Sequence, residues 1–197
     1  DPIFFNDRYT MEYHCKYFEA LAKKIGKYTE KCTISFLDLY RNTARNTQSL
    51  NIQRETTEQC FEIMQRLSNI AARYGLYIDT CCESIELKEL GISHAHCIDK
   101  ERFERIGNYK LTIEKDKNQR SECGCIASID IGAYNTCKNG CLYCYANYSC
   151  STVMRNMQIH DPVSPLLFGK VHSDDVIKER SVKSCRDCQL SLFDFEQ

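Results

Sequence analysis

Cys32-Thr33-Ile34-Ser35-Phe36-Leu37 sets the architecture of this chain, because its β-branched and aromatic residues predict a buried strand. Leu76-Tyr77-Ile78-Asp79-Thr80-Cys81 predicts a second buried strand. Between the two, residues 56–75 carry apolar side chains at helical spacing, and Gln59 follows Thr56 at the distance of a capping box. A strand, a helix and a strand in this order predict parallel strands joined by a crossover helix.

The same alternation continues on both sides of this unit. Residues 10–26 repeat apolar side chains at helical spacing, and short helices are expected at residues 84–90 and 99–106. At the start, Asp1-Pro2-Ile3-Phe4-Phe5 has the character of the end of another buried strand, so we expect earlier elements to be missing from this chain.

We predict an α/β fold with two regions. Residues 1–110 form a partial (β/α) TIM-barrel-like half with parallel strands, because they supply roughly half of the eight units of a full barrel. Residues 111–197 form a cysteine-rich, mostly irregular region that packs on the barrel as part of one structural unit. In such folds the residues after each strand line the active mouth. The predicted mouth residues are Asp1, Asp38, Arg41, Asn42, Cys81, Cys82 and Glu83.

Three of these mouth residues, Asp38, Arg41 and Glu83, are the candidate catalytic residues. Their position after predicted strands is the reason, since substrate binds at that end of such folds. The alternative for Asp38 and Arg41 is a solvated pair in a surface loop, which contributes little to stability.

Composition narrows the class of protein. The chain has 197 residues, fourteen cysteines and a formal net charge of -1. So many cysteines indicate either disulfides in an oxidising environment or metals in a reducing one. We expect no signal peptide and no membrane span, and the cysteines gather late in the chain. We therefore predict a cytoplasmic metal-binding protein, and its near-zero charge gives no signal for nucleic acid.

Cys137-Lys138-Asn139-Gly140-Cys141-Leu142-Tyr143-Cys144 spaces three cysteines as C-x-x-x-C-x-x-C. Three thiolates on one short loop can ligate three irons of a 4Fe-4S cubane, which leaves the fourth iron open. Gly140 lets the backbone turn sharply between two ligands. Zinc sites prefer C-x-x-C pairs with longer spacers, so a zinc loop or unligated thiols are the alternatives. Cys137, Cys141 and Cys144 are the predicted ligands of the first cluster.

A second group of thiols precedes this loop. Cys123-Gly124-Cys125 is a tight pair, Cys97 lies upstream, and the fourth ligand could be Cys81 or Cys82 at the end of a predicted strand, with Cys81 the better candidate. Together, these four thiolates could hold a second iron–sulfur cluster or a zinc ion. The alternative is ordinary buried cysteines, which are common. His94 and His96 are alternative ligands of this site.

The remaining cysteines have simpler interpretations. Cys185 and Cys188 form a C-x-x-C near the end of the chain, which could be half a zinc site, a redox pair or neither. So close to the terminus we expect weak or no function. Cys15, Cys32 and Cys60 lie on apolar faces of predicted elements and are expected in the core.

Three polar or aromatic residues near the C-x-x-x-C-x-x-C loop are candidate cofactor-binding residues. Asp130 and Asn135 could hydrogen-bond to cluster thiolates or to a ligand, or could hold the loop through Asx turns. Tyr143 could shield the cluster or contact an adenine ring, with ordinary packing as the alternative.

The chain resembles the C-terminal two-thirds of an uncharacterised bacterial family, the domain-of-unknown-function family 1848. The family's C-terminal cysteine cluster is itself described as resembling the cluster motif of radical S-adenosylmethionine (AdoMet) enzymes. The resemblance implies no known reaction. The stretches that carry it include Ile34-Ser35-Phe36-Leu37-Asp38-Leu39-Tyr40, Cys123-Gly124-Cys125, Asp130-Ile131-Gly132-Ala133-Tyr134-Asn135-Thr136-Cys137 and Gly140-Cys141-Leu142-Tyr143-Cys144-Tyr145-Ala146-Asn147.

The cysteine motif and this resemblance together imply a radical-AdoMet-type enzyme. In such an enzyme the reduced cluster cleaves AdoMet, and the 5'-deoxyadenosyl radical takes hydrogen from a substrate in the barrel mouth. Its partners would be an unknown substrate and an electron donor such as flavodoxin or ferredoxin. Two features depart from that class: the cysteine loop follows the β/α units, and the chain has no Gly-Gly pair.

The alternative function is a non-catalytic electron-transfer or structural module, holding iron–sulfur or zinc, that binds a partner. Nucleic acid is one such partner, contacted by basic residues of a polar segment. Basic residues spread through a polar loop are usually only solvated, so nucleic acid is the weaker expectation. The residues concerned are Lys110, Lys115, Lys117 and Arg120.

Overall fold

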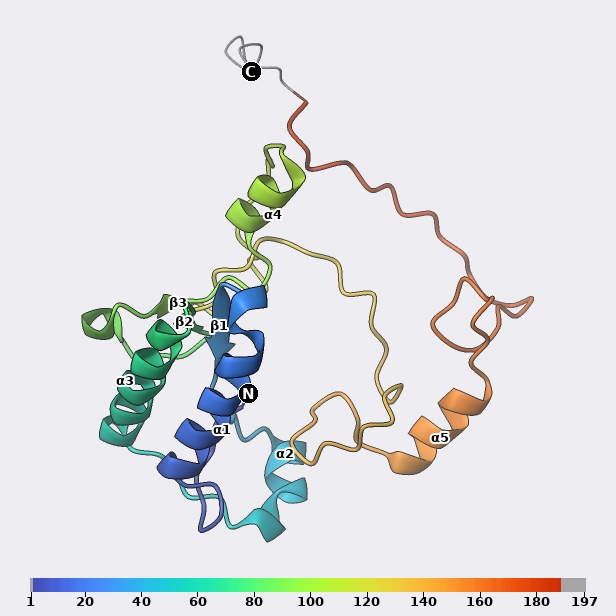
Figure 1. Ribbon diagram of the computed structural model, residues 1–197. Coiled ribbons are helices and arrows are strands. Elements are labelled where there is room, and N and C mark those ends of the chain that lie inside the picture. The colour runs from blue at the N-terminus through green and yellow to red at the C-terminus, as the bar shows by residue number, and fades with distance from the viewer. Residues whose placement is uncertain (1, 189–197) are drawn as a thin grey trace.

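Three parallel strands form the sheet of the computed structural model, which describes residues 2–188 (Figure 1). In sheet order they are β1 (Lys31–Ile34), β2 (Tyr77–Thr80) and β3 (Ser93–His94). The register pairs Lys31 with Tyr77. The strands predicted at residues 32–37 and 76–81 are confirmed in shorter form. The third strand was not predicted, because two residues leave no alternation to recognise.

Helices α1 (Met11–Ile25) and α3 (Thr57–Arg73) pack against each other over the sheet (Figure 1). Thr10 caps α1 through its side chain. Thr56 forms the predicted capping box with Gln59, in which each side chain bonds the other residue's backbone N–H. These caps satisfy N–H groups that the first turn of a helix leaves without partners.

The hydrophobic core lies between these two helices and the sheet. Ile63 and Met64 of α3 are completely buried in it. Burying an apolar side chain of this size contributes about 1.5–3 kcal/mol. The three cysteines predicted for the core are confirmed there: Cys60 is buried, and Cys15 and Cys32 pack half-buried against the same cluster.

The first described residues extend the sheet beside β1. Ile3 N donates to Ser35 O at 2.7 Å, and Leu37 N donates to Ile3 O at 2.9 Å. Ile3 therefore pairs in parallel with Phe36, and both Ile3 and Phe5 are buried. The buried strand end expected here is therefore present only as an isolated bridge at Ile3. Asp1, predicted as a mouth residue, lies outside the described residues.

The sheet is open and does not close into a barrel, so the predicted half barrel is corrected to a three-stranded parallel α/β sheet. The helix predicted at residues 84–90 is only a 3-10 turn, η3 (Lys88–Leu90). Helix α4 (Lys100–Gly107) confirms the one predicted at residues 99–106. Helix α2 (Arg41–Asn46) was not predicted, since its six residues carry no apolar stripe. Two more 3-10 turns are η1 (Gly26–Tyr28) and η2 (Gln48–Leu50).

After residue 110 the chain leaves the sheet, reaches α2, continues through α5 (Cys150–Gln158) and returns to α4 (Figure 1). Helix α5 lies in the region predicted to be mostly irregular. The returning tail pairs with the outgoing chain, because Leu111 bridges Arg186 in antiparallel fashion. Within the described part of the chain, no helix combines the length and apolar character needed to cross a membrane.

Candidate functional site

The first group of predicted ligands lies on a closed loop, residues 135–146, here named the cysteine loop. Asn135 N donates to Ala146 O at 2.9 Å and closes it. Asn135 is only 3% exposed, and its Oδ1 accepts hydrogen bonds from Tyr148 N at 3.0 Å and Ser149 N at 3.2 Å. Ser149 caps α5. The side chain of Asn135 therefore fastens the loop to the start of α5 through contacts distant in the sequence, and not through the Asx turn considered for it.

The three thiols of the cysteine loop are held by backbone geometry. Cys137 and Cys141 are exposed and Cys144 is half-buried. Cys144 N donates to Cys141 O at 3.1 Å, and Asn147 Nδ2 donates to Cys137 O at 2.7 Å. Gly140 has a φ of 66°, a conformation that favours glycine and gives the expected sharp turn. Cys137 and Cys141 are therefore presented outward, and Cys144 lies partly covered.

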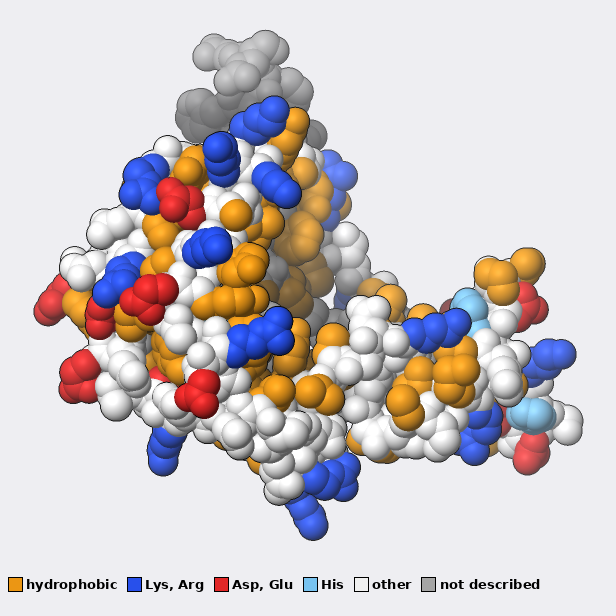
Figure 2. Space-filling model, turned by 60° about the horizontal axis from the view of Figure 1, so that its bottom comes forward, with side chains coloured by type: hydrophobic (Ala, Val, Ile, Leu, Met, Phe, Trp, Pro, Cys, Tyr) orange, Lys and Arg blue, Asp and Glu red, His pale blue; other side chains and the backbone are white. Residues whose placement is uncertain are grey.

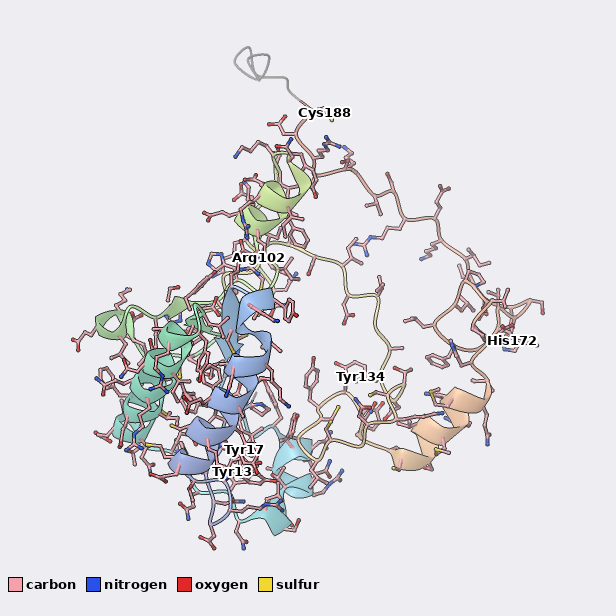
Figure 3. All side chains as sticks on the ribbon, in the orientation of Figure 1. Tyr13, Tyr17, Arg102, Tyr134, His172 and Cys188 are labelled. Carbon is pink, nitrogen blue, oxygen red and sulfur yellow. The ribbon has the colours of Figure 1, made fainter. Side chains whose placement is uncertain are left out.

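The cysteine loop lies against helix α2 (Figure 1). The hydroxyl of Thr43, which is completely buried, donates to Tyr143 O at 3.4 Å. The rings of Tyr40 and Tyr145 lie 6.4 Å apart between centroids. Tyr134 lies just before the loop, on the side of α2 that faces α5 in the view of Figure 3. Because α2 follows β1, these contacts set the loop beyond the carboxyl end of β1.

Two of the three candidate catalytic residues meet at the carboxyl edge of the sheet. Arg120 Nη1 contacts Asp38 Oδ2 at 2.9 Å, and Phe36 N donates to Glu83 Oε1 at 2.8 Å. Burial raises the pKa of Glu83, the Phe36 hydrogen bond opposes the rise, and the Asp38 charge adds to it. Arg41 is exposed on the first turn of α2. Arg120, which the sequence suggested only as a basic residue, takes the place beside Asp38.

The structure brings together parts of the second thiol group. Cys97 Sγ lies 3.5 Å from Cys81 Sγ, although the two are sixteen residues apart. Cys125 Sγ accepts a hydrogen bond from Ile98 N at 3.3 Å. Cys123 and Cys125 are buried, at 5% and 7% exposure. Burial, followed by the neighbouring Cys97, raises the pKa of Cys81 to about 12.

A metal ion needs more convergence than these thiols show. In residues 2–188, no three His, Cys, Asp or Glu side chains are arranged to hold one ion. Thiolates around a tetrahedral zinc lie about 3.8 Å apart, which the Cys81–Cys97 pair approaches. A cubane spreads its ligands more widely, since each iron binds its own thiolate. Three thiolates are the number of protein ligands expected above for a cubane with one open iron.

The two histidines proposed as alternative ligands have other neighbours. His94 Nε2 lies 3.4 Å from Glu86 Oε1, while its Nδ1 is buried without a partner among the described residues. The ring of His96 lies directly over Gly124, so that a Cβ at this position would overlap the ring. Glycine between Cys123 and Cys125 is therefore explained by the close approach of His96.

The other candidate cofactor-binding residues lie in exposed parts of the chain. Asp130 Oδ1 accepts a hydrogen bond from Gly132 N at 2.6 Å, as in the Asx turn considered for it. Tyr143 is 39% exposed. Burial raises its pKa, and the adjacent Cys141 and Cys144 add to the rise. Tyr143 thus stays beside two of the predicted cluster ligands.

The basic residues considered for nucleic acid already have partners or lie in solvent. Figure 2 shows Lys and Arg side chains scattered among acidic ones on the face drawn, with no continuous basic surface. Two surface hollows, of about 370 and 400 Å³, lie at residues 114–119 and around Lys27–Glu30, and no cysteine lines either. Three of the basic residues have partners: Lys110 contacts Glu104 at 3.5 Å, Lys115 donates to Ser121 O at 2.7 Å, and Arg120 pairs with Asp38.

The C-terminal C-x-x-C lies far from the cysteine loop. Cys188 lies just beyond α4 at the top of the view of Figure 3, well away from Tyr134 near its centre. Thr112 N donates to Cys185 O at 2.7 Å, and both Cys185 and Cys188 are exposed. The structure thus gives this pair no part in the site.

Substituting Glu83 tests the hydrogen bond that links the chain after β2 to the chain after β1. Glu83→Ala should lower the free energy of unfolding by about 1–3 kcal/mol, because Phe36 N–H loses its acceptor, whereas Glu83→Gln keeps one and should cost much less. The folded-state pKa of Glu83 is raised, so the parent binds a proton more readily when folded. The free energy of unfolding of the parent, compared with that of Glu83→Gln, should therefore fall as pH rises from about 4 to 7. Urea unfolding across this range measures both effects, and equal stabilities of the two variants would contradict the assigned hydrogen bond.

Comparison with known proteins identifies a family. A family model described as "Domain of unknown function (DUF1848)" matches residues 1–146. The match covers the sheet, both thiol groups and the whole cysteine loop. It bears out the family predicted from the sequence and gives no evidence of a radical-AdoMet motif. No curated protein and no solved structure matches.

Proposed function

We propose a function from the premise that this chain belongs to the DUF1848 family, whose description names no reaction. The chain is an iron–sulfur protein, and Cys137, Cys141 and Cys144 are the protein ligands of one 4Fe-4S cluster. Such a cluster supplies one-electron chemistry when bound. It is carried at the carboxyl edge of the α/β sheet, beyond the end of β1.

One observation carries this proposal: the cysteine loop has three free thiols and no buried side chains between residues 136 and 145. The loop is nevertheless closed by Asn135 and seated on Thr43. Exposed thiols gain nothing by packing, whereas thiolates gathered on a metal cross-link the loop, and the binding energy adds to folding.

The fourteen cysteines, all present as free thiols, favour a reducing compartment, for which we propose the cytoplasm. An electron donor of the flavodoxin or ferredoxin type would then be the partner of the cluster. Reconstitution with iron and sulfide under anaerobic conditions tests the cluster itself. We expect broad visible absorption and, after reduction, a paramagnetic signal. Uptake of zinc alone, with no iron, would overturn the proposal.

The finer proposal is that the chain is a radical-AdoMet-type enzyme. Its support is that the cysteine loop offers three ligands, so that the fourth iron would be free for AdoMet. Asp38, Arg120 and Glu83 form a polar group that follows β1 and β2. Their role would be to bind and orient a polar substrate there, with Asp38 and Arg120 held by their mutual ion pair. Tyr143 would lie against the loop thiols, where it can limit the access of water.

Reduced protein supplied with AdoMet tests this step. Dithionite-reduced, cluster-loaded protein should release 5'-deoxyadenosine well above the level of a Cys144→Ala control, and AdoMet should change the spectrum of its cluster. Chromatography of the products and the paramagnetic signal measure the two effects. A loaded cluster that shows neither effect would leave the electron-transfer or structural module as the function of the chain.

A further inference from the structure

Two thiols that are distant in the sequence meet at the carboxyl edge of the sheet, apart from the cysteine loop. Cys81 directly follows β2, and Cys97 lies shortly after β3. The pairing of these strands continues past β3, because Ala95 N donates to Thr80 O at 2.6 Å. This ladder places the sulfur atoms of Cys81 and Cys97 3.5 Å apart.

The surroundings distinguish this pair from the neighbouring cysteines. Cys97 is exposed and Cys81 is half-buried, so that a small reagent can reach Cys97 first. The sulfur of Cys125 is buried and accepts the Ile98 N–H. Cys82 follows Cys81 with a φ of 54°, in the left-handed region, so its backbone turns away from the strand direction. Cys81 is therefore the thiol best placed to react with Cys97.

We infer that Cys81 and Cys97 form a dithiol–disulfide pair that exchanges with small-molecule disulfides such as oxidised glutathione. A disulfide requires an S–S distance near 2.05 Å, so the sulfurs need to approach by about 1.5 Å. Rotation of the exposed Cys97 side chain supplies such a movement. The pair does not depend on the cluster of the cysteine loop.

The exchange proceeds in two balanced steps. The Cys97 thiolate attacks one sulfur of oxidised glutathione, which breaks the glutathione disulfide and releases one glutathione thiolate. Cys81 then gives its proton to solvent and attacks the Cys97 sulfur, which releases the second glutathione. Two protein thiols are thereby oxidised, and one glutathione disulfide is reduced to two thiols.

Peptide mass spectrometry tests the inference on the folded, reduced chain. The chain is treated with oxidised glutathione, alkylated and digested with trypsin, which places Cys81 in residues 74–88 and Cys97 in residues 89–100. We expect these two peptides to be joined by a disulfide in the parent and in the matched control Cys82→Ser. The Cys81→Ser variant should instead keep glutathione on Cys97, because the thiol that displaces it is gone.

Each other outcome counts against the pair. If the parent keeps glutathione on Cys97 to the same extent as Cys81→Ser, the two thiols do not react with each other. If the link is lost in Cys82→Ser and kept in Cys81→Ser, the partner is Cys82. If the reduced chain instead retains zinc that Cys81→Ser loses, and forms no link, these thiols are the metal site considered from the sequence. Parent protein unfolded in urea serves as a reference, in which Cys97 should lose its preference for Cys81.

Discussion

Replacing Cys141 with serine should abolish the iron–sulfur cluster of the reconstituted protein. Cys141 is the middle ligand of the cysteine loop, and a hydroxyl at its position is a much poorer ligand for iron than a thiolate. Because Cys141 is exposed, its replacement leaves no cavity in the core. We therefore expect the visible absorption and the bound iron to be lost, while circular dichroism still reports a folded chain.

Cys150→Ser is the matched control for this experiment. Cys150 is also an exposed cysteine, and it opens α5 just beyond the cysteine loop. Its replacement should leave the iron content equal to that of the parent. A Cys141→Ser protein that keeps its full complement of iron would show that other thiols hold the cluster.

Replacing Asn135 with alanine should release the cysteine loop from α5. The substitution removes the Oδ1 that accepts two backbone N–H groups, and it places alanine at a φ of 56°. Lost acceptors and the left-handed backbone together should cost about 2–4 kcal/mol. The cost falls on the loop, so hydrogen exchange and proteolysis within residues 135–149 should increase more than global unfolding changes.

Two other substitutions at Asn135 separate these contributions. Asn135→Asp keeps an acceptor and tolerates the left-handed conformation, so it should have the smallest effect. Asn135→Gly relieves the backbone but removes the acceptor, and it should lie between aspartate and alanine. Equal exchange in all three variants would mean that the side chain of Asn135 does not hold the loop.

Long periodic segments made the fold predictable. The apolar stripe and capping box of α3, and the β-branched residues of β1 and β2, each follow from local preferences that agree with the final packing. Helix α2 and strand β3 are too short to show a period, so they form only because tertiary contacts hold them. The prediction of a partial barrel was wrong, because open and closed parallel sheets share the same repeated strand–helix order.

The candidate site was predictable in its residues and less so in its arrangement. Cysteine spacing marks the loop of Cys137, but nothing local shows that Thr43, almost a hundred residues earlier, supports it. Cys81 meets Cys97 because β2 and β3 end at the same edge of the sheet. Of these two strands, only β2 was predicted from the sequence. A pairing of Asp38 with Arg41 was only the alternative considered for these residues, and Arg120 reaches Asp38 instead, from a polar segment whose path no pattern predicts.

Chemical analysis of iron and acid-labile sulfide in anaerobically purified protein tests the central claim most directly. We expect iron and sulfide in equal amounts, about four of each for every cluster, and their loss when Cys137, Cys141 and Cys144 are replaced together. Stoichiometric zinc without sulfide, or iron and sulfide unchanged in the triple variant, would contradict it.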